Sequence, residues 1–291
     1  MPAAFVACGV RSRLCLINKP QMSCIAGRIA GRIVGRQFGT AAVRQSLDVT
    51  KFATLDFEQF GPLSAGHHFN FGKFRAHNRP GHGLLRLFDD GLIAPNARIP
   101  EHPHRNIDIV TVVLPENLHP FTGRLEGGSP VLHTDSHGFQ DSIEPGSVQV
   151  MSVGSDGMQH AEMASSRDKS ANAFQIWLRQ TEKQPTSDYG THKLPLAEPK
   201  KFAILASGFP NDNATPLKSP SRVLSVLLTP DQQVEYHLGD RKAYIAASSG
   251  RIEVSGVELA AHDGVKVANE SSVTIKAVGE INSQVVVVDT I

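Results

Sequence analysis

Residues 147–163 read SVQVMSVGSDGMQHAEM, and this stretch holds the features that decide the fold. Residues 147–151 alternate apolar and polar side chains, which is the two-residue period of a β-strand. Residues 154–157 supply Gly, Ser and Asp, the residue types of a tight turn. His160 and Glu162 follow, two positions apart, so on a second strand they share one face. The stretch therefore predicts two strands joined by a turn, the second carrying two side chains that can bind a metal.

Short segments of the same kind recur from about Thr54 to the C-terminus, separated by Gly, Pro, Asn and Asp. In the first half they are residues 69–71, 83–88, 107–113, 147–151 and 174–178. In the second half they are residues 222–228, 243–247, 251–254, 264–267, 272–277 and 284–289. No long helical period is present, so the pattern predicts an all-β protein built from sandwiches or barrels.

The two sets of strands are separated by a stretch rich in Gln, Pro, Thr, Ser and Lys, which we interpret as a linker over residues 183–199. This places a first barrel at residues 48–182 and a second at residues 200–291. Two all-β halves suggest duplication of one barrel, although no residue repeat aligns between them.

Composition excludes two classes of partner. The 291 residues carry a net charge of +1, which gives no general field to attract nucleic acid. No uninterrupted apolar stretch reaches the roughly 18 residues that a membrane-spanning helix needs. We therefore expect neither direct nucleic-acid binding nor a membrane span.

The first 47 residues have the composition of a targeting leader. Their basic residues all precede Asp48, the first acidic residue, and are Arg11, Arg13, Lys19, Arg28, Arg32, Arg36 and Arg44. An Arg-rich, acid-free segment of this kind is typical of a mitochondrial presequence, here with cleavage expected after Arg36. A plastid address is the main alternative, and a retained basic tail would leave the protein in the cytoplasm or nucleus.

All three cysteines, Cys8, Cys15 and Cys24, lie within this leader. The mature protein is therefore expected to have neither disulfides nor cysteine catalysis.

A second pair of metal-binding residue types lies upstream. His102 and His104 are separated by one residue, so on a strand both imidazoles project from the same face. Each pair alone is a weak signal, because 13 histidines give about one His-x-His by chance. Together, His102, His104, His160 and Glu162 predict three nitrogens and one carboxylate oxygen around one divalent metal. This set suits Fe(II), Mn, Ni or Co, whereas closed structural zinc sites usually contain thiolates.

These residues resemble the pirin family, which are bicupins with a metal in the first barrel. The resemblance runs from about Leu55 to the C-terminus and is specific only in the first half. It is carried, in order, by residues 92–95, 102–105, 135–136, 144–149, 160–163 and 174–177. It implies two tandem cupin jelly-roll barrels, with metal ligands at the four positions above, Fe(II) the expected ion and no ligand set in the second barrel.

Two departures from the family pattern stand out. Asp108 occupies a position where the family has Glu, and residues 115–130 lengthen a hairpin. We expect this insertion to reshape the mouth of the pocket, since loops at a barrel rim usually control what enters.

Three functions remain open on the sequence. The resemblance implies a quercetin 2,3-dioxygenase-like enzyme that takes dioxygen and a flavonol or related chelating enol, with Glu162 both ligand and proton acceptor. The alternative is a non-enzymatic regulator whose metal state alters binding of a protein partner. A third is a cupin that binds a small molecule without turning it over.

Overall fold

The computed structural model describes residues 47–74, 79–193 and 198–291, which belong to one compact unit. The expected leader lies outside the described residues except for Leu47. Within them no helix is long and apolar enough to cross a membrane. The only helical elements described are two short turns, η1 (Phe52–Thr54) and η2 (Pro210–Asp212).

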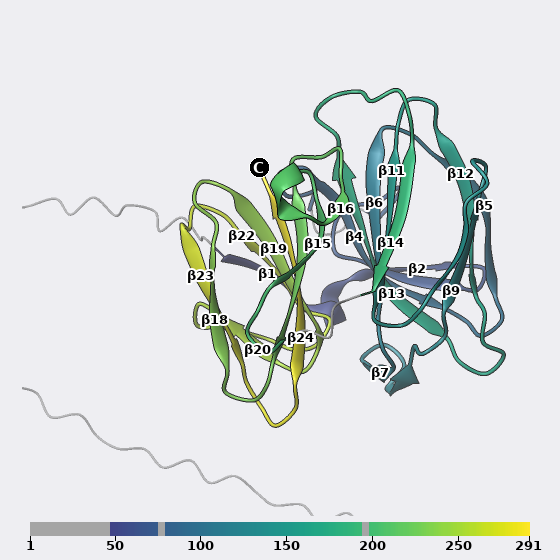
Figure 1. The fold of residues 1–291 in the computed structure, drawn as a ribbon. Helices are drawn as coiled ribbons and strands as arrows, with labels where there is room; N and C mark the ends of the chain where they lie inside the picture. Colours follow the sequence, from purple (N-terminus) through teal and green to yellow (C-terminus); the bar gives the residue numbers. More distant parts are fainter. Residues whose placement is uncertain (1–46, 75–78, 194–197) are drawn as a thin grey trace, which may run out of the picture. The chain divides into compact units, whose positions relative to one another are not determined.

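The first half is a barrel made of a seven-stranded and a four-stranded sheet (Figure 1). The larger sheet, in spatial order, contains β14 (Asp188–Lys193), β11 (Ser147–Val153), β6 (Ile107–Val113), β13 (Ala171–Arg179), β4 (Leu85–Ile93), β3 (Leu63–His67) and β2 (Asp56–Phe60). The smaller sheet contains β10 (Gln140–Ile143), β9 (Val131–Asp135), β12 (Met158–Ala164) and β5 (Arg98–His104). A separate hairpin pairs β7 (Asn117–His119) with β8 (Arg124–Glu126).

The second half repeats this arrangement. Its larger sheet contains β1 (Leu47–Thr50), β22 (Gly264–Val267), β19 (Lys242–Ser249), β24 (Ser283–Thr290), β17 (Arg222–Leu228), β15 (Ala203–Ser207) and β16 (Thr215–Pro216). Its smaller sheet contains β18 (Gln233–His237), β23 (Ser272–Ala277), β20 (Ile252–Val254) and β21 (Val257–Leu259). The predicted all-β bicupin architecture is thus confirmed.

The division of the chain between the two barrels differs from the expected boundaries. β1 pairs with β22 in the second barrel, with Leu47 opposite Val267, although residues 48–182 were assigned to the first. Leu47 and Val49 pack against the apolar core of the second barrel, which explains the placement. Within the expected linker, β14 pairs with β11 and covers the edge of the first barrel. Residues 69–71, expected as a strand, form only an isolated bridge from Phe71 to Phe74.

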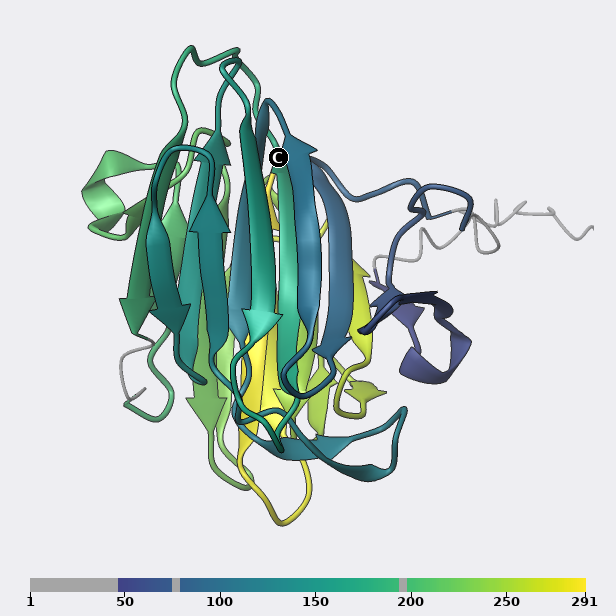
Figure 2. The ribbon, with the colours of Figure 1, turned by 90° about the vertical axis from the view of Figure 1, so that its right-hand side faces the viewer.

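The larger sheets of the two halves pack face to face, and in Figure 2 the strands of the first half lie in front. Their shared core includes Val110 and Phe174 from the first half and Tyr244 and Val286 from the second. Both faces of these sheets are therefore buried, one against the other half and one inside its own barrel.

The two barrel interiors differ in how they are filled. In the second barrel one continuous apolar cluster, with members such as Ile245, Val265 and Ile275, occupies the interior. In the first barrel the apolar side chains form two smaller clusters, one around Val113 and one around Ile109. A polar residue, Thr111, lies between them on β6. The apolar interior of the first barrel is thus interrupted by polar side chains, whereas that of the second forms one cluster.

Candidate metal centre

Two neighbouring strands bring the predicted ligands together. β5 carries His102 and His104, and β12 carries His160 and Glu162. The strands are antiparallel, with His160 directly opposite His102. The register shifts between His160 and Glu162, and such a bulge changes the direction of side chains beside it.

The three imidazoles converge on one point. The ring centroid of His160 lies 4.3 Å from that of His102 and 5.0 Å from that of His104. One nitrogen from each ring lies within 4.8 Å of the others. Glu162 is not within that spacing of all three, although it follows on the same strand and is buried. The structure therefore places three predicted ligands in a tight group, with the fourth beside them.

The hydrogen bonds leave nitrogens free to coordinate. His102 Nδ1 lies 2.9 Å from the carbonyl oxygen of Pro100, so Nδ1 carries the proton and Nε2 has a lone pair. His104 Nε2, both ring nitrogens of His160 and Glu162 Oε1 are buried without a hydrogen-bond partner among the described residues. Buried polar atoms are normally paired, so this cluster fits a site that a divalent cation completes.

Burial also controls protonation. Desolvation, with the charge of His102, lowers the pKa of His104 to about 4. Desolvation and the neighbouring histidines lower the pKa of His160 further. Both imidazoles are therefore neutral near pH 7, the form that binds metals. Burial raises the pKa of Glu162 to about 7, against a hydrogen bond from Gln175 that lowers it.

A cavity of about 370 Å³ opens beside the cluster, within the roughly 300–1,000 Å³ range of small-molecule sites. Its lining includes His102 and His104, with Phe71 and Trp177 as aromatic walls. A second cavity of about 50 Å³ contains Glu162. Five residues, including Asp89 and Gln175, line both, so the two spaces adjoin.

Four other polar or aromatic side chains lie near the candidate ligands. Trp177 packs against the apolar cluster around Ile109 and also lines the cavity, with its ring centroid 5.0 Å from that of His104. Gln175 also lines the cavity. Arg105 is exposed and donates to the carbonyl of Ser155, holding a loop. His133 is not a candidate ligand, because Asp135 and Gln149 occupy both of its ring nitrogens.

A second group, which sequence reasoning missed, consists of Asp90, His119 and His262, all buried with potential ligand atoms within 4.8 Å. His119 Nδ1 accepts a hydrogen bond from the amide of Phe121 at 3.3 Å. In the neutral ring Nε2 must then carry the proton, and it donates to Asp90 at 3.4 Å. His262 Nδ1 also donates to Asp90, as does Asn172. Asp90 thus accepts three hydrogen bonds, whereas His262 Nε2 is buried without a hydrogen-bond partner among the described residues.

The insertion at residues 115–130 does not line either cavity, contrary to expectation. Instead, Asn117 donates to the carbonyl of Ser248 in the second barrel, and Phe121 stacks on Phe57 with centroids 4.7 Å apart. Asn117 thus contacts the second barrel, whereas Phe121 packs on β2 of the first. Asp108 likewise lies outside the site and accepts hydrogen bonds from the backbone of residues 218–219.

Comparison with known proteins identifies the family. The profile of the family described as Pirin matches residues 50–178, and that of the quercetinase C-terminal cupin domain matches residues 204–290. The chain belongs to the pirin family. A pirin-like protein of Caulobacter vibrioides is 34% identical over 246 residues, covering 84% of this chain and 99% of that protein.

Two further pirin relatives come from Escherichia coli. A quercetin 2,3-dioxygenase is 26% identical, over 79% of this chain and 92% of the relative. A bacterial pirin solved in complex with nickel(II) shares the fold with a TM-score of 0.73 and 24% identity, over 84% of this chain and 98% of that one.

Proposed function

We propose that this pirin binds one divalent metal through His102, His104, His160 and Glu162 and catalyses the reaction of dioxygen with a chelating enol, such as a flavonol. The observation that carries the proposal is the convergence of three imidazoles, two of which, His102 and His104, line an aromatic-walled cavity. The names of relatives as quercetin 2,3-dioxygenases support the substrate class.

Three imidazoles and a carboxylate form a ligand set of intermediate softness, which suits Fe(II), Ni(II), Mn(II) or Co(II). Fe(II) is the ion that we propose, and the nickel bound by the E. coli relative shows what a protein of this fold can accept. When bound, such an ion supplies Lewis acidity, which makes a chelating hydroxyl easier to deprotonate.

The protein's own residues would bind, orient and shield the substrate. Phe71 and Trp177, whose rings meet edge to face with centroids 5.6 Å apart, offer apolar surface to a flat aromatic molecule. The buried position of Glu162 keeps its carboxyl away from water. We assign Glu162 a second role as acceptor of the proton from the substrate hydroxyl.

Oxygen consumption with quercetin tests this proposal. We expect metal-dependent uptake that falls by a factor on the order of 10² or more in Glu162→Gln, the usual contribution of a positioned acid or base. Glu144→Gln, an exposed carboxylate changed in the same way, is the matched control and should retain activity. Turnover that survives Glu162→Gln would contradict the catalytic role of Glu162.

Metal binding without oxygen uptake would instead favour a metal-dependent regulator or a binding protein. Location separates these functions, and we keep mitochondrial targeting by residues 1–47 as a proposal. A fusion of these residues to a fluorescent protein should enter mitochondria, whereas nuclear fluorescence of the full-length chain would favour the regulator.

A further inference from the structure

One row of the larger sheet in the first barrel is polar from strand to strand. Gln149 lies opposite Thr111, Thr111 opposite Gln175, Gln175 opposite Asp89, and Asp89 opposite His67. Residues two positions away on these strands, such as those flanking Thr111, belong to apolar clusters. The row therefore forms a polar track across the floor of an otherwise apolar barrel.

The track ends in an imidazole between two carboxyl groups. His67 Nδ1 donates to Asp89 Oδ1 at 2.9 Å, and His67 Nε2 lies 3.7 Å from Glu58 Oε2. The side chains of His67 and Asp89 are 2% and 11% exposed, and that of Glu58 is 27% exposed. His67 Nε2 has no hydrogen-bond partner among the described residues. Asp89 receives one hydrogen bond, from His67, and Lys73 Nζ lies 4.0 Å from Glu58 Oε1, so the carboxylates at this end of the track can accept further hydrogen bonds.

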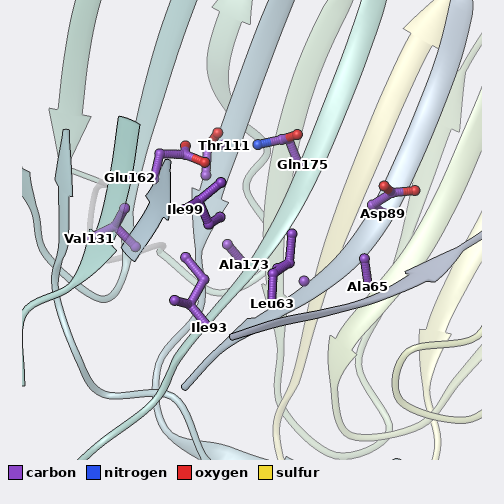
Figure 3. Close-up of a pocket in the computed structure, with 11 residues that line it drawn as sticks. Leu63, Ala65, Asp89, Ile93, Ile99, Thr111, Val131, Glu162, Ala173 and Gln175 are labelled. Carbon is purple, nitrogen blue, oxygen red and sulfur yellow. The ribbon is translucent and has the colours of Figure 1, made fainter. Parts of the chain in front are cut away.

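These three residues share a cavity with the candidate metal ligands. Glu58, His67 and Asp89 line the same 370 Å³ space as His102 and His104. Figure 3 shows Glu162 and Asp89 on opposite sides of the smaller adjoining cavity, with Gln175 between them. A molecule held at the metal ligands can therefore extend toward Glu58, His67 and Asp89.

We propose that Glu58 and Asp89, which lie on either side of His67, form a specificity site that accepts hydrogen bonds from hydroxyl groups at the end of the substrate remote from the metal. The inference rests on the proposed function and names its substrate class: flat aromatic molecules with a chelating enol at one end and phenolic hydroxyls at the other. A largely buried carboxylate costs free energy when only part of its hydrogen-bonding capacity is used, and phenolic hydroxyls supply additional donors. The same carboxylates repel ligands with a carboxylate at this end.

Binding without turnover tests the site directly. Trp177 is the only tryptophan of the chain and lines the cavity, so its fluorescence reports ligand entry. The nickel-loaded protein is titrated without oxygen with quercetin and with 3-hydroxyflavone, which keeps the chelating group and lacks the remote hydroxyls. The variant is Glu58→Gln/Asp89→Asn, because the Asn carbonyl can still accept from His67. Glu253→Gln in the second barrel is the matched control.

We expect the wild-type protein and the control to bind quercetin about tenfold more tightly than 3-hydroxyflavone, the effect of one hydrogen bond to a charged group. In the double variant that preference should fall to about twofold or less while binding of 3-hydroxyflavone is unchanged. An unchanged preference would overturn the inference, as would an equal loss for both ligands, which indicates a structural role.

Oxygen uptake distinguishes failure of the specificity site alone from failure of the proposed function. If the variant keeps the wild-type preference while the wild type still consumes oxygen with quercetin, only the specificity site is wrong. If the wild type neither binds these ligands nor consumes oxygen, the proposed function fails and the specificity site fails with it.

Discussion

Hydrogen-bond partners decide which histidines of this chain are available to a metal. His102 donates through Nδ1 to a carbonyl and so presents Nε2, whereas His119 accepts at Nδ1 and so has its proton on Nε2. Sequence spacing found His102, His104 and His160 because i and i+2 residues of a strand share a face. It could not find the group around Asp90, whose three members come from distant segments with no spacing in common.

We predict that Asp90→Asn destabilises the protein without changing its metal content. The neutral amide weakens charge-assisted hydrogen bonds from His119 and His262, at a cost of about 1–3 kcal/mol. Urea unfolding measures the free energy, with the exposed Asp168→Asn as control. A metal content that falls from two ions to one would instead make this group a second metal site.

At the scale of elements, the number of buried apolar residues determined which strands could be predicted. The strands at residues 107–113, 222–228, 264–267 and 272–277 have the predicted bounds. Edge and short strands such as β2, β14 and β16 were missed because they carry fewer buried apolar residues. The assignment of β1 to the second barrel depends on a partner more than 200 residues away, which no local pattern reports.

This pairing predicts where the chain can be shortened. A chain that begins at Leu47 keeps β1, whereas one that begins at Lys51 exposes the edge of β22 and removes Thr50, which is fully buried. We expect a lower melting temperature for the shorter chain, measured by circular dichroism. Equal melting temperatures would show that β1 contributes no stability to the second barrel.

At the scale of the whole molecule, we assign the two barrels different roles because different side chains occupy their interiors. The second interior holds one continuous apolar cluster, whereas the first has a polar track and adjoining cavities. The strand patterns predicted two barrels, but they did not predict which face of each larger sheet points into its own barrel. Alternation in residues 174–177 is the same whichever face meets the second half, so the sequence alone does not place Trp177 at the cavity.

The contact between the halves should make stability depend on pH. His68 Nδ1 lies 2.7 Å from the hydroxyl of Tyr244 in the second barrel, and burial lowers the pKa of His68 from 6.5 to about 3. Between these values the unfolded chain binds a proton that the folded protein does not. Stability from this group is therefore lost as pH falls, by up to about 1.4 kcal/mol per pH unit.

His68→Asn removes this titration and keeps a polar partner for Tyr244. The free energy of unfolding, measured from pH 7 to pH 4, should fall less steeply in the variant than in the wild type. The exposed His237→Asn is the control and should follow the wild type. If the free energy of unfolding falls equally steeply with pH in the wild type and in His68→Asn, the pH dependence does not come from His68.

The central claim is that the first barrel holds a metal, and elemental analysis of the purified protein tests it most directly. The protein, reconstituted with Fe(II), Ni(II), Mn(II) or Co(II), is compared with His102→Ala/Glu162→Ala and with His237→Ala, an exposed histidine of the second barrel, as the control. We predict about one ion per chain in the wild type and in the control, and almost none in the double variant. No bound metal under any of these conditions, or equal metal in the double variant, would contradict the claim.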